Sequence, residues 1–277
     1  MIKLLLTNLD GNTEEVITPT LFPDGTSQCW KIDSISKNYR NCVKAEILWR
    51  FENESELIHV AQLSDLLDSY TGGTKPLKVL NIPFYPYGRQ DKPITNTSTF
   101  AEKTFAKLVD SMKFDRVISF DVHGTATVQN LHNVSANNVI KKVFEHNGYD
   151  VYCYPDGGAT ERYLHEPSIN GVKVRDHYTG KIKDYYLVTE YEDKTGKTHG
   201  VEVEGKKVLI VDDICDYGNT FIQLAELLKQ HKPAEIGLYV SHGLFSGGME
   251  KLIECGITKF YYTNSLVRND ETGIKLF

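Results

Sequence analysis

Short strand-like runs alternate along this chain with segments whose apolar residues recur at helical spacing. The runs are rich in valine and isoleucine, mostly end in polar residues, and cover 78–84, 116–122, 149–155, 207–213 and 235–242. The helical patterns lie between them, at 98–112, 135–148 and 220–231. Alternation of this kind predicts parallel sheets covered by helices. Ligands bind beyond the carboxyl ends of such strands, so the polar residues there are site candidates as a group.

Composition and charge argue against several classes of protein. The formal net charge is -6, whereas binding to a nucleic-acid backbone needs a clustered basic surface. No apolar run approaches the roughly 18 residues of a membrane span, and the start of the chain predicts a first strand rather than a signal peptide. We therefore expect no nucleic-acid or membrane partner. The scattered cysteines predict free thiols in the cytoplasm and no zinc site. They are Cys29, Cys42, Cys153, Cys215 and Cys255.

The stretch VLIVDDICDYGNTF, residues 208–221, holds the densest group of polar candidates. Its aliphatic residues predict a buried strand, with Asp212 and Asp213 at the carboxyl end. A tight turn into a helix starting near Thr220 would present backbone N–H groups that suit a phosphate. The carboxylates suit sugar hydroxyls or a hydrated magnesium ion. Helix capping alone would explain one aspartate, but not three around one strand end.

This stretch resembles the phosphoribosyl-diphosphate binding motif of the type I phosphoribosyltransferase fold, to which the ribose-phosphate diphosphokinases also belong. The resemblance implies that Asp212 and Asp213 hold the ribose hydroxyls. The residues implied to hold the 5-phosphate are Asp216, Tyr217, Gly218, Asn219 and Thr220.

The resemblance also implies the fold class. We expect an α/β protein with two phosphoribosyltransferase-like domains, each a mostly parallel β-sheet flanked by helices. Residues 1–146 would form the N-terminal domain with the ATP-binding motifs. Residues 147–277 would form the C-terminal domain with the ribose-phosphate motif. Within the latter, residues 166–206 are rich in turns and predict hairpins or a flap.

Two segments resemble the ATP site of ribose-phosphate diphosphokinases. In PFYPYGRQDKP, residues 83–93, the resemblance implies that Arg89 and Gln90 contact the nucleotide and that Asp91 supports the loop. In FDVHG, residues 120–124, it implies that His123 lies near magnesium and the ATP phosphates. The plainer alternatives are a Pro/Gly surface loop for the first segment and a structural histidine for the second.

The segment LFPDGTSQ, residues 21–28, resembles the family loop that reaches the ATP site of a neighbouring subunit. Phe22 and Asp24 match the family pattern, while Thr26 stands where the family has glutamate. The resemblance implies a homodimer or higher homo-oligomer whose ATP site is shared between subunits. By itself the segment predicts only a turn.

Two further segments match the family around the transferring group. In PDGGATERY, residues 155–163, the resemblance makes Asp156 a magnesium ligand, with His123 as the other candidate. Gly157 and Gly158 would let the backbone approach the sugar. In GVKVRDHYTGK, residues 171–181, Lys173 and Arg175 have the spacing of the family's catalytic cations on one face of a strand. If other cations take this role, the candidates are Lys181, Lys183 and Lys194. The plainer alternative is a solvated basic hairpin without a catalytic role. SHGLFSGG, residues 241–248, resembles a segment near the subunit contact.

Together the motifs predict an ATP-dependent diphosphokinase with Mg²⁺ as cofactor. It would transfer the β,γ-diphosphate of ATP to the anomeric C1 hydroxyl of ribose 5-phosphate, giving phosphoribosyl diphosphate and AMP. The phosphate turn departs from the family's Asp-Thr-Gly-Gly-Thr at Tyr217 and Asn219, although asparagine tolerates a left-handed backbone. Because tyrosine stacks on nucleobases, ADP-ribose is the alternative acceptor, as in a phage-type variant that serves NAD rebuilding. A phosphoribosyltransferase that consumes the diphosphate and an inactive regulatory subunit are the further alternatives.

Overall fold

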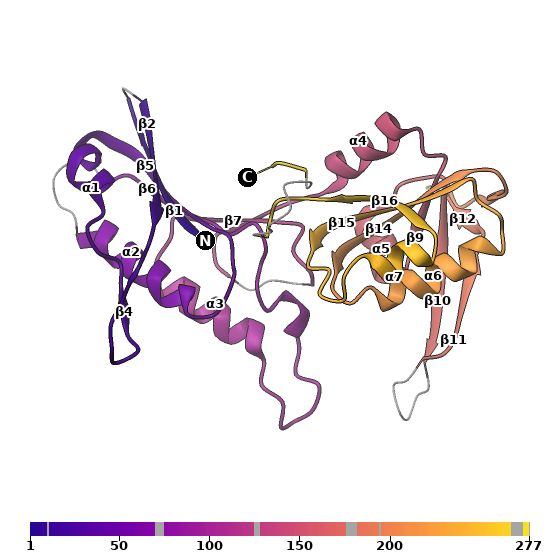
Figure 1. The fold of residues 1–277 in the computed structure, drawn as a ribbon, viewed down its shortest axis with the longest axis horizontal. Helices are drawn as coiled ribbons and strands as arrows, with labels where there is room; N and C mark the ends of the chain where they lie inside the picture. The colour runs from indigo at the N-terminus through magenta and orange to yellow at the C-terminus, as the bar shows by residue number, and fades with distance from the viewer. Residues whose placement is uncertain are drawn as a thin grey trace. The chain divides into compact units, whose positions relative to one another are not determined.

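The computed structural model describes residues 1–9, 11–69, 75–124, 128–175, 182–193, 195–266 and 274–276. These residues form two compact units, one made mainly of Met1–Ser135 and the other mainly of Ala136–Asn264, each with a six-stranded sheet and a core of its own (Figure 1). The domain boundary predicted after residue 146 lies near the end of helix α4 (Asn137–Asn147). Helix α4 belongs to the second unit, where its Phe144 stacks on Tyr152 with ring centroids 3.8 Å apart.

Unit 1 is built on a mixed sheet with the strand order β2-β1-β5-β6-β7-β8. Strand β1 is antiparallel to both β2 and β5, and the strands from β5 to β8 are parallel. The strands are β1 (Ile2–Asn8), β2 (Gly11–Ile17), β3 (Thr20–Leu21), β4 (Ser27–Gln28), β5 (Cys42–Trp49), β6 (Leu77–Asn81), β7 (Arg116–Phe120) and β8 (Leu131–Val134). The helices are α1 (Asp33–Asn38), α2 (Glu56–Ser69) and α3 (Ala101–Ser111), with 3₁₀ turns η1 (Tyr39–Asn41) and η2 (Gly88–Gln90).

The core of unit 1 forms where α2 and α3 meet the sheet (Figure 1). Val60 and Leu63 of α2 and Phe105 of α3 are buried together with Leu4 of β1 and Ile47 of β5. Each helix thus turns one apolar face inward, as expected for helices that cover a sheet.

Unit 2 is built on a sheet with the strand order β11-β10-β9-β14-β15-β16. All neighbours are parallel except the hairpin β10–β11. The strands are β9 (Val151–Tyr154), β10 (Ser168–Arg175), β11 (Ile182–Val188), β12 (Glu190–Glu192), β13 (Thr198–Gly200), β14 (Lys207–Cys215), β15 (Glu235–Gly243) and β16 (Ile257–Tyr262). The helices besides α4 are α5 (Gly157–Tyr163), α6 (Asn219–Lys229) and α7 (Glu250–Glu254).

The expected fold class is confirmed, because both units are α/β with largely parallel sheets flanked by helices. Each predicted strand and helix corresponds to an element of the same type. The predicted hairpins of residues 166–206 are the antiparallel pairs β10–β11 and β12–β13. Among the described residues, no helix is both long and apolar enough to span a membrane.

Candidate active site

The strand order of unit 2 creates a ligand position between β9 and β14. The chain leaves β9 toward β10 on one side and returns as β14 on the other side of β9. Such a topological switch point is where ligands bind in open α/β sheets, outside the carboxyl ends of the strands. Asp156 follows β9, and Asp212 and Asp213 lie in the last part of β14. Three predicted site residues therefore meet at one edge of the sheet.

The position of Asp212 and Asp213 differs in one respect from the expectation. We expected the strand to end with them at Asp213, but β14 continues to Cys215, which pairs with Gly243 of β15. On the side of β9, pairing stops at Ile210 because β9 is the shorter strand. The two aspartates therefore lie on an extended segment that has a strand neighbour on one side only.

Asp156 is the N-cap of helix α5, and its side chain takes part in two interactions. Its Oδ1 accepts a hydrogen bond from the Ala159 backbone N–H at 3.3 Å, as expected of an aspartate that precedes a helix. Its Oδ2 lies 3.1 Å from the Lys173 ammonium, which forms an ion pair with it. A Cβ added at Gly157 would meet no atom within 4 Å, so the first turn of α5 is open above this glycine.

Asp212 and Asp213 are adjacent but have different surroundings. Asp213 is 3% exposed, and its Oδ2 accepts a hydrogen bond from the Arg162 guanidinium at 3.0 Å. Asp212 is half-buried, and its Oδ1 accepts the Asp213 backbone N–H at 2.9 Å. Burial, together with the nearby charges of Asp213 and Asp156, raises the pKa of Asp212 well above its usual range.

The predicted phosphate turn joins β14 to helix α6. Gly218 has a left-handed backbone with φ of 81°, and α6 begins at Asn219 without a side-chain cap. The left-handed position of this turn is thus taken by Gly218, and Asn219, of which we expected only that it tolerates such a backbone, is the first residue of α6. An uncapped helix N-terminus leaves backbone N–H groups that suit an anion. Tyr217 is 65% exposed and lies against Gly247 of the segment 241–248.

Lys173 lies on β10 opposite Tyr185 of β11. Its ammonium stands 5.7 Å from the centroid of the Tyr185 ring, in addition to its ion pair with Asp156. The Tyr185 hydroxyl donates a hydrogen bond of 2.9 Å to the Pro155 carbonyl, and burial raises the pKa of this tyrosine, which keeps it a donor. Arg175 ends β10 after a β-bulge, and its side chain lies outside the described part of the chain. Of the other candidate cations, Lys181 and Lys194 also lie outside it.

In unit 1, the two segments predicted to bind ATP pack against each other. The first includes the 3₁₀ turn η2 and leaves Arg89 and Gln90 exposed. A Cβ at Gly88 would lie 3.3 Å from the His123 carbonyl oxygen, and one at Gly124 would lie 2.9 Å from an Asp91 carboxylate oxygen. Asp91 of the first loop thus lies against Gly124 of the second.

The loops of unit 1 lie at the expected edge of the sheet. The segment with Arg89 follows β6, and the segment with His123 follows β7, so both come after the carboxyl ends of parallel strands. His123 itself is exposed. The arrangement suits recognition of a nucleotide by side chains from two neighbouring loops.

The hairpin β3–β4 carries Phe22 and Asp24. Asp24 accepts hydrogen bonds from the Thr26 hydroxyl and backbone N–H at 2.7 and 2.9 Å, and these bonds lower the pKa of its carboxyl. Phe22 is 38% exposed and lines a cavity of about 500 Å³ between the hairpin and helix α2. Thr26, which stands where the loop that this segment resembles has glutamate, thus fixes the hairpin tip.

Magnesium is compatible with the polar groups present. Carboxylate oxygens are ligands that Mg²⁺ prefers, and Asp156 keeps nearly half of its side chain exposed at the switch point. Among the described residues, no three histidine, cysteine or acidic side chains gather into a metal site. A magnesium ion would therefore take most of its ligands from water and phosphate oxygens, which is its usual mode of binding with nucleotides.

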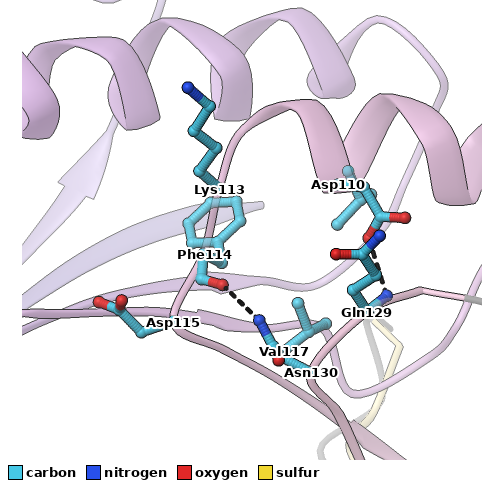
Figure 2. Close-up of a pocket in the computed structure, with 8 residues that line it drawn as sticks. Asp110, Lys113, Phe114, Asp115, Val117, Gln129 and Asn130 are labelled. Carbon is cyan, nitrogen blue, oxygen red and sulfur yellow. Dashed lines mark hydrogen bonds between the residues drawn. The ribbon is translucent and has the colours of Figure 1, made fainter.

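A further cavity of unit 1, of about 330 Å³, lies away from the predicted site residues (Figure 2). It lies around the start of β7 and is lined by Asp110, Lys113 and Asp115, among others. The Gln129 backbone N–H donates to Asp110 at 2.8 Å, and the Asn130 amide donates to the Phe114 carbonyl at 3.3 Å. Because the cavity is at the amino edge of the parallel strands, it is not the candidate site.

Arg162 and Tyr185 lie in the candidate site but were not among the predicted site residues. Arg162 stands within the segment 155–163, at the end of the helix that Asp156 caps, so its place in the motif was visible. Its partner Asp213 is 51 residues away and could not be deduced from spacing. Tyr185 reaches Pro155 across β10, which requires knowledge of the strand register.

Comparison with known proteins agrees with this geometry. A model of the phosphoribosyl transferase domain matches residues 169–256. The ribose-phosphate pyrophosphokinase of Pyrococcus abyssi is 27% identical over 250 residues, which cover 88% of this chain and 82% of that protein. A putative ribose-phosphate pyrophosphokinase 2 of Lactococcus lactis is 25% identical, with 97% of this chain and 85% of that protein covered.

A solved structure shows the same fold. The phosphoribosylpyrophosphate synthetase from Mycobacterium smegmatis matches with a TM-score of 0.71 at 21% identity, covering 94% of this chain and 86% of that one. The order of the motifs, the two α/β units and these similarities lead to one conclusion. Over most of its length the chain is similar in sequence to ribose-phosphate pyrophosphokinases, and it has the fold of a phosphoribosylpyrophosphate synthetase.

Proposed function

We propose that this protein transfers the β,γ-diphosphate of Mg-ATP to the anomeric C1 hydroxyl of ribose 5-phosphate, giving phosphoribosyl diphosphate and AMP. The observation that carries the proposal is the group of carboxylates at the switch point of unit 2, in the segment that leads to the uncapped N-terminus of α6. Carboxylates accept hydrogen bonds from sugar hydroxyls, and a helix N-terminus attracts a phosphate. The two features together suit a phosphorylated ribose.

The acceptor sugar is held by unit 2. Asp212 and Asp213 are assigned to the ribose hydroxyls, and the turn Asp216–Thr220 to the 5-phosphate. Gly157 and Gly158 leave space for the ring, because a Cβ at the first would meet no atom and one at the second only Asp156. Holding both ends of the sugar fixes the anomeric hydroxyl for attack, which is the main contribution of a protein to such reactions.

The nucleotide is assigned to Arg89, Gln90 and His123, with Asp91 supporting their loops and with Phe22 and Asp24 contributed by another subunit of a homo-oligomer. In the reaction, the anomeric oxygen forms a bond to the β-phosphorus of ATP. The bond between this phosphorus and the oxygen that bridges to the α-phosphate breaks, AMP leaves with that oxygen, and the hydroxyl proton passes to solvent. The reaction thus needs alignment and charge stabilisation more than covalent chemistry from the protein.

The stabilisation of negative charge on the transferring diphosphate is assigned to Lys173, Arg175 and magnesium. The ion pair between Lys173 and Asp156 supports this assignment, because it holds the ammonium beside the predicted metal ligand. Bound Mg²⁺, with Asp156 and His123 as candidate ligands, would neutralise the phosphate oxygens. Two or three such cations stabilise a phosphoryl transition state by several kcal/mol.

The test is an incubation of the purified protein with Mg-ATP and either ribose 5-phosphate or ADP-ribose, with AMP measured by chromatography. AMP formed with ribose 5-phosphate supports the proposal. If neither acceptor yields AMP, the diphosphokinase function is refuted, and a phosphoribosyltransferase or an inactive regulatory subunit becomes the better account.

ADP-ribose is the second candidate acceptor because of Tyr217. This side chain is 65% exposed on the phosphate turn, where the family has a small hydroxyl residue. ADP-ribose carries a free anomeric hydroxyl and an adenosine group beyond the 5-phosphate, and a base stacked on tyrosine gains about 1–3 kcal/mol. If Tyr217 stacks on this adenine, Tyr217→Ala should raise KM for ADP-ribose about tenfold or more, while Tyr217→Phe keeps it near the original value. Equal KM values for Tyr217→Ala and the unmodified protein would rule out stacking.

A further inference from the structure

The adjacent carboxylates of β14 are unequal partners for a sugar. Asp213 is nearly fully buried and already accepts a charge-assisted hydrogen bond from Arg162 at 3.0 Å. Asp212 is more exposed, and within the part of the chain that the structure describes it has no lysine or arginine partner. A ligand hydroxyl would therefore compete with Arg162 at Asp213, whereas at Asp212 it would compete with no cation of the described residues.

Burial explains why the pair between Arg162 and Asp213 is needed. An ionised carboxylate without a partner is costly in a buried position, and removing one partner of a buried pair is strongly destabilising. Arg162 is suited to this task because the guanidinium stays charged and keeps a fixed planar geometry. It stands on α5, the helix that Asp156 caps, so the pair links the end of β14 to the segment that follows β9.

A hydrogen bond from the Asp213 backbone couples the orientation of the Asp212 side chain to the position of Asp213. The Asp213 N–H donates to Asp212 Oδ1 at 2.9 Å, which orients the Asp212 carboxylate along the strand end. Holding the side chain of Asp213 therefore also holds the donor that orients Asp212.

We infer that Arg162 is a positioning residue that holds Asp213 as a structural ion pair, so that Asp212 is the carboxylate that binds the hydroxyls of the acceptor sugar. This inference rests on the proposed function for the identity of the sugar. The resemblance implies that both aspartates hold the ribose hydroxyls, whereas this inference gives that role to Asp212.

The pairing is tested first by thermal unfolding of the full chain without ligand. The variants are Arg162→Met, Asp213→Asn and the double variant, with Glu161→Gln as the matched control on the same helix, where the side chain is exposed. Arg162→Met should lower Tm by about 5–10 °C, because it removes the guanidinium from a buried carboxylate. The double variant should lose clearly less than the sum of its single variants, and the control should stay within about 1 °C of the unmodified protein. Additive losses would overturn the pairing.

The division of tasks is tested by calorimetric titration with ribose 5-phosphate and with ADP-ribose, in the absence of ATP. Inorganic phosphate serves as the probe of the turn alone. Asp212→Asn should weaken sugar binding about tenfold or more and leave phosphate binding unchanged. In the reaction, Arg162→Met should raise KM for the acceptor by more than it lowers kcat, and Arg162→Lys should recover part of the lost affinity. Those two responses distinguish positioning from a purely structural role.

Two results would overturn the inference. One is an Asp213→Asn variant with unchanged Tm and the same loss of sugar affinity as Asp212→Asn. The other is an Arg162→Met variant with low Tm but unchanged KM. If AMP forms with neither acceptor, the proposed function fails, whereas the unfolding experiments still report whether Arg162 and Asp213 are coupled. The two failures are therefore distinguishable.

Discussion

Among single residues, Gly171 of β10 shows how closely the candidate site is packed. A Cβ at this position would lie 2.5 Å from the Tyr185 hydroxyl oxygen and 2.9 Å from the Pro155 carbonyl oxygen. Both distances are shorter than ordinary van der Waals contact. Tyr185 can reach Pro155 only because residue 171 has no side chain, and the same tyrosine packs beside Lys173.

Gly171→Ala should therefore lower the free energy of unfolding by about 1–3 kcal/mol, the usual cost of overpacking a well-filled site. Denaturant unfolding measures this change. Gly200→Ala is the matched control, because its added Cβ would meet no atom within 4 Å, and it should change stability by less than about 1 kcal/mol. Equal effects of the two substitutions would mean that the contact with Tyr185 relaxes without cost.

The residues of the site were predictable to different degrees. Asp156 and Asp212 could be assigned to one edge because parallel strands place their carboxyl ends together. The pair between Arg162 and Asp213 could not, because it depends on how α5 lies against β14. The pair of Lys173 with Asp156 likewise depends on the register of β10. Sequence patterns thus indicate which residues gather at one edge of the sheet, whereas the ion-pair partner of each residue depends on tertiary packing.

At the scale of elements, local periodicity was sufficient to predict the central strands and the helices that cover them. The run 235–242 became β15 and the pattern 98–112 became α3, with boundaries shifted by a few residues. Strand β5 and helix α2 were not identified, although both contribute to the core of unit 1. The end of β14 was set by its pairing with β15 as far as Cys215, which is a tertiary effect that no local pattern contains.

The hairpin β3–β4 is held to helix α2 by a buried histidine. The Ser27 hydroxyl lies 2.7 Å from His59 Nε2, and Gln62 of the same helix bonds to the backbone of Ser27 and Cys29. Burial lowers the pKa of His59, against a weaker opposite effect of Glu56. The folded protein therefore resists protonation of this ring, which titrates near 6.5 in the unfolded chain.

Stability should consequently depend on pH through His59. Because its folded pKa is lowered, the contribution of neutral His59 is fully present above about pH 6.5 and is lost as pH falls through the folded pKa. Between pH 7.5 and 5, Tm of the unmodified protein should fall by more than Tm of His59→Gln, as measured by thermal unfolding. His231→Gln, at an exposed position, should keep the original dependence. A His59→Gln variant with that same dependence would contradict this assignment.

At the scale of the molecule, both units follow one architectural principle. In each, parallel strands carry polar residues at their carboxyl ends: Arg89 and His123 in unit 1, Asp156 and Asp212 in unit 2. Each unit also encloses a separate apolar core. Under the proposed function, unit 1 would bind the nucleotide and unit 2 the phosphorylated sugar, each beyond the carboxyl ends of its parallel strands.

Because each unit has a core of its own, we expect a cavity in one core to destabilise mainly the unit that contains it. Leu80 of β6 and Leu238 of β15 are both fully buried, one in each core, so they form a matched pair. Replacing either by alanine should cost about 2–5 kcal/mol in its own unit. Hydrogen exchange followed by mass spectrometry should then show faster exchange in β5, β6 and α3 for Leu80→Ala, and in β14, β15 and α6 for Leu238→Ala. If either substitution accelerated exchange equally in both sets of elements, the two cores would form one cooperative folding unit, and stability could not be adjusted in one unit without affecting the other.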